Sequence, residues 1–178
     1  MTSFIASSAL RSAWHPVAEG ADIVGSPHAV TLLGDRYVVW RTADGTLLAA
    51  PDRCPHREAP LSAGTVCDGV LTCPYHGWSF GDRGRCVGVP SSGEGAAVPP
   101  TAHLPCVKVD ERYGLVWMCP GEPTEAIPVV AHEDDPRFRR INSGIQHWAV
   151  CTTRMVDNFC DISHFPWVHT GTFGAGQS

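Results

Sequence analysis

Short apolar runs separated by glycine and aspartate turns fill the first two thirds of the chain. β-Branched and aromatic residues occupy positions 28–33 and 37–42, and Gly34-Asp35 between them predicts a hairpin. Further short strands are expected at 46–50, 70–73, 78–80, 85–89, 107–110 and 113–119. Short strands at even spacing are typical of a sandwich or a barrel, so we expect a small all-β domain.

The pattern changes after residue 120. A stretch rich in proline and acidic residues follows and is typical of a linker. Beyond it, residues 138–141 and 146–151 have the composition of strands, and residues 153–164 have that of a helix. The expected organisation is a loose N-terminus over 1–11, the β domain over 12–120, a linker over 121–136 and the start of an α+β domain over 137–178.

Composition places the chain among folded proteins and excludes some partners. The 178 residues are 43% hydrophobic and 17% charged, which leaves room for one domain and part of another. A net charge of −5 without a basic run argues against nucleic acid or an anionic membrane as a partner. No apolar stretch is long enough to span a membrane, and residues 1–10 lack the features of a secretory signal. We therefore expect a cytoplasmic protein.

The chain has eight cysteines, which in a small secreted protein would indicate a disulfide framework. Without an export signal, reduced thiols are the better interpretation. Cys54 and Cys73 are candidate metal ligands, whereas the other six lie among apolar residues and are expected to be buried. These six are Cys67, Cys86, Cys106, Cys119, Cys151 and Cys160.

Two short loops each contain one cysteine and one histidine, Cys54-Pro-His56 and Cys73-Pro-Tyr-His76. Two cysteines and two histidines can bind zinc, but this spacing is unusual for zinc fingers and ribbons. The pattern suits a [2Fe–2S] cluster with two thiolates on one iron and two imidazoles on the other. Neutral imidazoles raise the reduction potential of such a cluster to about −150 to +300 mV. A zinc-stabilised binding module is the competing interpretation.

The residues around these loops extend the pattern. Residues 53–64 read RCPHREAPLSAG and residues 72–80 read TCPYHGWSF. Both segments resemble the Rieske domain of ring-hydroxylating and demethylating oxygenases. Respiratory Rieske proteins have an additional cysteine in each loop, and neither loop has one here. The resemblance implies a Rieske-type [2Fe–2S] cluster bound by Cys54, His56, Cys73 and His76.

A second group of candidate residues lies in the predicted helix. Asn158, Asp161 and His164 follow one another at steps of three, which places them within a third of the helix circumference. Pro166 should end the helix and let the chain return, so that His169 reaches the same point. Two imidazoles can form two corners of a two-histidine–one-carboxylate iron site with open positions for dioxygen. Without the upstream loops, a structural role for these histidines would be the better interpretation.

Rieske oxygenases share this Asn-x-x-Asp-x-x-His-x4-His pattern. The resemblance implies that His164 and His169 bind a mononuclear non-heme Fe(II). It also implies that Asp161 bridges His164 and His76 of the partner subunit, with Asn158 as a supporting or weak ligand. Residues 162–178 contain no Asp or Glu, so the carboxylate ligand is expected elsewhere in the catalytic domain. We therefore expect the chain to be a fragment or one piece of a split protein.

The implied fold is an all-β Rieske domain, a small antiparallel sandwich or barrel with two cluster-binding loops, followed by the beginning of an α+β catalytic domain. The implied function is that of the large (alpha) oxygenase component of a Rieske non-heme iron oxygenase. A reductase or ferredoxin would supply electrons, and dioxygen would hydroxylate or oxidatively demethylate an organic substrate, expected to be aromatic. The resemblance also implies a homotrimer. The alternative is a Rieske-type electron carrier without catalysis, although a carrier needs no second histidine pair.

Overall fold

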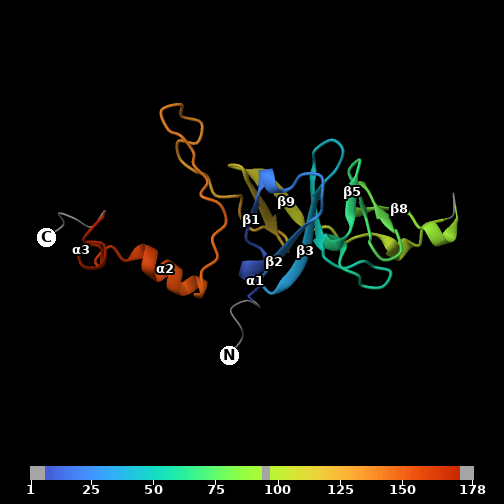
Figure 1. Cartoon of the computed structure of the whole chain (residues 1–178), viewed down its shortest axis with the longest axis horizontal. Coiled ribbons are helices and arrows are strands. Elements are labelled where there is room, and N and C mark those ends of the chain that lie inside the picture. Colours follow the sequence, from blue (N-terminus) through green and yellow to red (C-terminus); the bar gives the residue numbers. More distant parts are fainter. Residues whose placement is uncertain (1–6, 94–96, 173–178) are drawn as a thin grey trace. The chain divides into compact units, whose positions relative to one another are not determined.

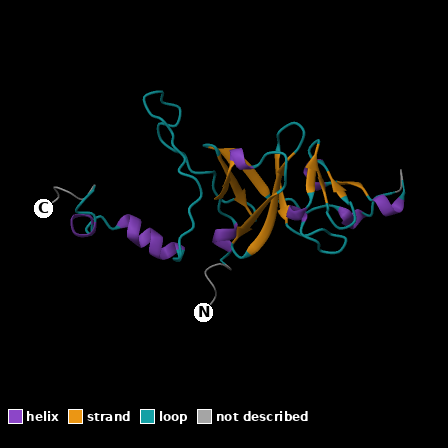
Figure 2. Ribbon diagram, viewed as in Figure 1, coloured by secondary structure: helices purple, strands orange, loops and turns teal. Residues whose placement is uncertain are grey.

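The structure is a computed structural model and describes residues 7–93 and 97–172. The chain divides into two compact units, Met1–Gly144 and Ile145–Ser178 (Figure 1). The first unit contains the strands and the second contains two helices (Figure 2). No helix among the described residues has the length and apolar character needed to cross a bilayer.

Antiparallel strands form three sheets in the first unit, which confirms the expected all-β fold. One sheet has the order β1 (His15–Glu19), β10 (Leu115–Cys119), β9 (Lys108–Arg112). The second has the order β2 (His28–Leu32), β3 (Asp35–Arg41), β4 (Leu47–Pro51). The third has the order β5 (Thr65–Cys67), β6 (Val70–Thr72), β7 (Ser79–Phe80), β8 (Cys86–Gly88).

Local turns explain most of these pairings. The expected hairpin at Gly34 is present, with Leu32 paired to Asp35 across Leu33 and Gly34, both of which have positive φ. Two consecutive residues with positive φ give the backbone twist that suits a two-residue hairpin. Strands β1 and β5 were not expected from the sequence. Strand β1 pairs with the distant β10, whereas β5 pairs with β6 across Asp68 and Gly69, both of which have positive φ.

Strand β3 separates two hydrophobic cores. Val38 and Trp40 belong to one core, and Tyr37 and Val39 belong to the other. This alternation follows from the two-residue repeat of a strand, which sends successive side chains to opposite faces. All four side chains are buried, so β3 is covered on both faces. The core that contains Trp40 also contains Cys54 and Cys73, and we call it the ligand-side core.

Most helices of the first unit are single turns. They are α1 (Ser8–Arg11), η2 (Gly20–Asp22), η3 (Leu61–Ala63), η4 (Asp82–Gly84), η5 (Pro90–Ser92) and η6 (Pro100–Ala102). Thus part of the N-terminus expected to be loose is helical. Part of the expected linker also packs on this unit, since Gly121 donates to the Arg11 carbonyl and Ile127 is buried.

Two expectations for the C-terminal region are wrong. Residues 138–141 and 146–151 form no strand, because a strand needs a neighbour to accept and donate its backbone hydrogen bonds and the described residues supply none. The expected helix over 153–164 is shorter, since α2 spans Thr152–Cys160. A separate short helix, α3, spans Phe165–Val168.

Candidate functional site

The first loop is a tight turn that follows β4. The Cys54 amide donates to the Ala59 carbonyl at 2.9 Å, and the Glu58 amide donates to the Cys54 carbonyl at 2.8 Å. Glu58 closes this turn with φ of 58°, a conformation that non-glycine residues seldom adopt. The turn therefore holds Cys54 at its base and presents the residues after it at the tip.

The second loop, between β6 and β7, repeats the same backbone bonds. The Cys73 amide donates to the Trp78 carbonyl at 2.8 Å, and the Gly77 amide donates to the Cys73 carbonyl at 3.1 Å. Gly77 has φ of 71° at the position that Glu58 occupies in the first loop. The two loops thus have the same turn conformation. The histidine is two residues after the cysteine in the first loop and three residues after it in the second.

The two turns bring the histidines together. The ring centroids of His56 and His76 are 4.6 Å apart, and their planes are inclined by 63°. The His56 ring stacks on Trp78 at 4.7 Å with the planes 2° from parallel. Tyr75 lies against His76 at 3.8 Å, and its own side chain is exposed. The imidazoles are therefore held by aromatic neighbours at the outer end of the loops.

The cysteines lie deeper than the histidines. Cys54 and Cys73 are 1% and 3% exposed, whereas His56 and His76 are exposed. Burial, together with the neighbouring Cys73, raises the pKa of the Cys54 thiol to about 11 against the opposing effect of the His56 and Arg57 backbone amides. Partial desolvation lowers the pKa of His56, with added effects from His76 and Arg57. The lowered pKa favours the neutral His56 imidazole, the form that binds metal, whereas the Cys54 thiol must release a proton to become a ligand.

The donors fit a two-iron cluster better than one metal ion. The described part of the chain holds no group of three or more His, Cys, Asp or Glu side chains that could share one ion. The donors instead form one sulfur pair and one imidazole pair, as a Rieske-type [2Fe–2S] cluster requires. The indole N–H of Trp78, on the ring that stacks with His56, is buried without a hydrogen-bond partner. An acceptor such as a cluster sulfide would satisfy such a donor.

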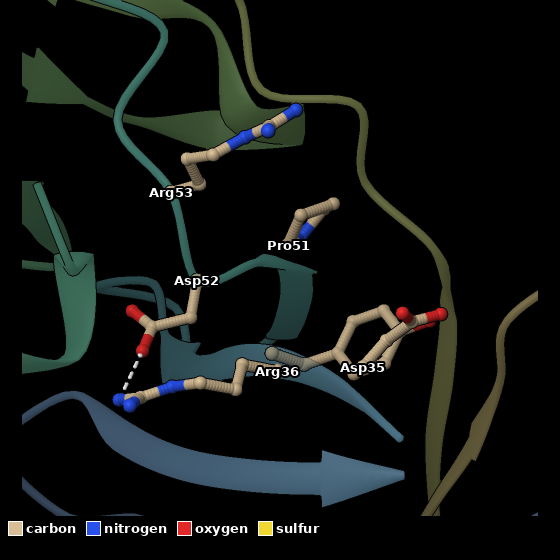
Figure 3. A pocket seen from close by; sticks show the side chains of 6 residues that line it. Asp35, Arg36, Pro51, Asp52 and Arg53 are labelled. Carbon is tan, nitrogen blue, oxygen red and sulfur yellow. Dashed lines mark hydrogen bonds and ion pairs between the residues drawn. The ribbon is translucent and has the colours of Figure 1, made fainter. Parts of the chain in front are cut away.

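Asp52 is a residue of this site that the sequence analysis missed. It ends up buried just after β4, and its carboxylate accepts hydrogen bonds from both the amide and the hydroxyl of Ser62, each at 2.7 Å. Arg36 donates to the same carboxylate at 3.0 Å (Figure 3). In the sequence, Asp52 is simply an acidic residue between an expected strand and a candidate ligand. That position does not reveal hydrogen-bond partners distant in the sequence.

The second unit brings three of its four expected residues together. The ring centroids of His164 and His169 are 5.3 Å apart. His164 Nδ1 lies 3.4 Å from an Asp161 carboxylate oxygen, and the Ser163 amide donates to the other oxygen at 2.8 Å. The hydrogen bonds from Ser163, followed by the interaction with His164, lower the pKa of Asp161. Asp161 is thus an anionic acceptor beside one of two neighbouring imidazoles.

The geometry behind this grouping differs from the expected one. Helix α2 ends at Cys160, and Asp161 is extended with φ of −89° and ψ of 108°. Asn158 is exposed on α2, whereas His164 lies beyond the end of that helix, so Asn158, Asp161 and His164 do not share one continuous helix. Pro166 lies in the first turn of α3, where its missing N–H is tolerated, and does not end a helix. His164 and His169 cap the two ends of α3.

The other cysteines correct a further expectation. Cys86 and Cys119 are buried as expected, but the remaining four are exposed: Cys67, Cys106, Cys151 and Cys160. All eight cysteines are free thiols. Apolar sequence neighbours did not bury these four, because strand ends and the second unit leave them at the surface.

Comparison with known proteins yields two family matches. Residues 13–108 match the Rieske [2Fe-2S] domain, and residues 148–178 match the vanillate O-demethylase oxygenase C-terminal domain. The first match contains both cysteine–histidine loops. The second contains Asp161, His164 and His169.

Relatives similar along most of the chain include several demethylases. The chain is 36% identical to methylxanthine N1-demethylase NdmA of Pseudomonas putida, over 92% of this chain and 48% of the relative. It is 37% identical to the oxygenase component of dicamba O-demethylase of Stenotrophomonas maltophilia, over 90% of this chain and 48% of the relative. The solved structure of NdmB from Pseudomonas putida CBB5 matches with a TM-score of 0.86 and 33% identity, over 93% of this chain and 52% of that one. The chain spans about half the length of these relatives.

Proposed function

Because the chain belongs to the Rieske [2Fe-2S] domain family, we propose that it is part of the terminal oxygenase component of a Rieske non-heme iron oxygenase. The observation that carries this proposal is the meeting of two imidazoles above two buried cysteines on loops with the same turn. When bound, the cluster would take up and release single electrons, and a mononuclear Fe(II) would activate dioxygen. The reaction would be hydroxylation or oxidative demethylation of a small organic, and we propose aromatic, substrate.

The first unit would hold the cluster. Cys54 and Cys73 would bind one iron as thiolates, and His56 and His76 would bind the other as neutral imidazoles. The stacking of Trp78 on His56 fixes the orientation of that ring and limits water around it. Turns closed by Glu58 and Gly77 hold the two cysteines at their bases and present the two histidines nearer their tips.

The second unit would contribute part of the mononuclear iron site. His164 and His169 would be two ligands, with a carboxylate ligand from another part of the whole protein. Asp161 would accept a hydrogen bond from His164 Nδ1, which lies 3.4 Å from its carboxylate, and so orient that ring. In the assembled homotrimer that we propose, Asp161 would also accept from His76 of the partner subunit and connect the two metal sites. Asn158, on α2, would be a supporting residue or a weak ligand.

Partners and location complete the proposal. A reductase or ferredoxin would supply the electrons. Eight free thiols without a disulfide suit the reducing cytoplasm, where we propose the protein works. We expect no nucleic-acid or membrane partner, given a net charge of −5.

The test is the metal content and colour of the whole protein. We expect a red-brown protein with about three irons and about two sulfides per chain. Replacing His56 by Cys should retain a cluster but lower its reduction potential, because an anionic thiolate replaces a neutral imidazole. Cys67→Ser is the matched control, since Cys67 is an exposed cysteine of the same unit. Colourless protein that contains zinc would refute the proposal, and about two irons with electron transfer alone would favour the carrier.

The bridging role of Asp161 has a separate test. In the whole protein with its reductase, Asp161→Asn should leave the cluster spectrum unchanged and reduce substrate turnover at least roughly tenfold, since the positioning of both imidazoles would be lost. Asp157→Asn is the control, because Asp157 is exposed on α2 and pairs with Arg154. Unchanged turnover in Asp161→Asn would remove the bridge from the proposal.

A further inference from the structure

We propose that Asp52 is a positioning residue that holds the first cluster loop closed and that its own buried charge contributes to a lower reduction potential of the cluster. This inference rests on the proposed function of the loop as a cluster site. It concerns a residue that is neither a ligand nor part of the aromatic surroundings of the imidazoles.

The contacts of Asp52 close the loop from outside. The side chain is 0% exposed, and one carboxylate oxygen accepts from the Ser62 amide while the other accepts from the Ser62 hydroxyl. These bonds join residues 52 and 62 and enclose the inner turn formed by Cys54 and Ala59. The loop is therefore closed twice, once through its backbone and once through a buried carboxylate.

A third anchor connects the loop to the sheet. The Asp52 amide donates to the Arg36 carbonyl at 3.0 Å, and the Arg36 guanidinium donates to the Asp52 carboxylate at 3.0 Å. Arg36 belongs to β3, the strand that lies between the two cores. Figure 3 shows this pair beside a pocket whose other charged residues include Arg53, and the Arg53 side chain points away from the Asp52 carboxylate. Asp52 thus ties the loop to the strand that lies between the two cores.

Within the part of the chain that the structure describes, the second loop has no equivalent carboxylate anchor. Its side-chain bond runs from the Ser79 hydroxyl to the Gly77 carbonyl, within the loop region itself. The charge near the cluster is therefore asymmetric. Asp52 lies two residues before Cys54, and the guanidinium that pairs with it is 65% exposed. Water screens the exposed cation more than the buried anion, so the Asp52–Arg36 pair contributes a negative potential on the thiolate side. A negative potential disfavours an added electron, and for that reason Asp52 should lower the reduction potential.

The experiment uses the whole protein with its cluster and three variants. Asp52→Asn removes the charge and keeps an acceptor for Ser62. Ser62→Ala removes the hydroxyl donor and keeps the charge. Asp35→Asn is the matched control, because Asp35 lines the same pocket but is exposed and pairs with Arg11. The readouts are the reduction potential, the electron paramagnetic resonance spectrum of the reduced cluster, and the rate of iron loss to a chelator.

We expect Asp52→Asn to raise the reduction potential and Ser62→Ala to leave it near that of the unaltered protein. Both should accelerate iron loss, roughly tenfold for the loss of one buried hydrogen bond. Asp35→Asn should change neither quantity. Equal potentials and equal chelation rates in Asp52→Asn and Asp35→Asn would overturn the inference, whereas an unaltered protein without a cluster would overturn the proposed function instead.

Discussion

Glu58 and Gly77 hold the same backbone conformation with different residues. Both lie four residues after a cluster cysteine and have φ of 58° and 71°. A left-handed conformation costs a non-glycine residue about 1–2 kcal/mol. The first loop therefore contains local strain that the second avoids, and the anchoring of the first loop by Asp52 and Ser62 explains how that strain is tolerated.

Replacing Gly77 by Ala should lower the free energy of unfolding by about 1–2 kcal/mol, because a Cβ there is strained by its positive φ. That Cβ would also lie 3.1 Å from the Pro90 ring. Gly25→Ala is the control, since Gly25 has φ of 67° and open space around it. Denaturant unfolding of both variants separates backbone strain from contact with Pro90. A larger loss in Gly25→Ala than in Gly77→Ala would contradict this account.

The thiol of Cys106 should make stability depend on pH. Although the residue as a whole is exposed, its sulfur lies beside Gly84, and partial burial raises the pKa of the thiol to about 11. Because an unfolded thiol ionises near pH 9 and the folded one does not, the free energy of unfolding should fall as the pH rises from about 9 to 11. Denaturant unfolding across this range should show a shallower fall in Cys106→Ala. Identical slopes in the two proteins would rule out this contribution.

At the level of elements, β3 separates the core beneath the two cysteine–histidine loops from the second core. Val38 faces the ligand-side core with Cys54 and Cys73, and Val39 faces the other core. Both valines are 0% exposed. Substitutions at these two neighbouring positions should therefore affect different cores of the first unit.

Val38→Ala and Val39→Ala should each lower the free energy of unfolding by about 1–2 kcal/mol, since each removes buried methyl groups. We expect Val38→Ala to accelerate the loss of iron to a chelator and Val39→Ala to leave that rate nearly unchanged. Val87→Ala, at a side chain that is 57% exposed, should change neither. Similar chelation rates in Val38→Ala and Val39→Ala would show that the two cores do not act separately.

Elements defined by neighbouring residues could be predicted from the sequence, and elements defined by distant partners could not. The hairpin at Gly34 and the two cysteine–histidine loops follow from residues within a few positions of one another. The expected strands at 138–141 and 146–151 depended on partner strands that the described residues do not supply. The role of Asp52 required Ser62, which is ten residues away, and Arg36 on another strand.

The end of α2 shows the same limit. Steps of three between Asn158, Asp161 and His164 suggested one continuous helix, but Asp161 bonds to Ser163 and leaves the helical conformation. Aspartate competes for backbone groups in this way near helix ends. Asp161 and His164 are therefore neighbours as predicted, but not because they lie on one helix.

On the scale of the whole molecule, burial differs sharply between the two units. The buried apolar residues of both cores lie between residues 18 and 118, whereas Phe159, Ile162 and Trp167 of the second unit are 72%, 73% and 83% exposed. The first unit therefore contains the apolar contacts that a domain needs to fold.

A chain ending at Gly144 should fold and keep the visible spectrum of a Rieske cluster, because both loops and both cores lie within it. We expect its midpoint of thermal unfolding to lie within a few degrees of that of the 178-residue chain, measured by circular dichroism on cluster-containing protein. The same truncation with Cys73→Ser provides a control without the cluster. An unfolded or colourless truncated chain would show that residues 145–178 stabilise the first unit.

The different depths of the four proposed ligands would give cluster insertion a direction. Cys54 and Cys73 are almost inaccessible, whereas His56 and His76 are reachable from solvent. A preformed cluster handed over by a maturation protein would meet the imidazoles first and reach the sulfurs only after the loops open. We therefore expect the rate of maturation to become independent of donor concentration, at a ceiling set by the opening of residues 52–62.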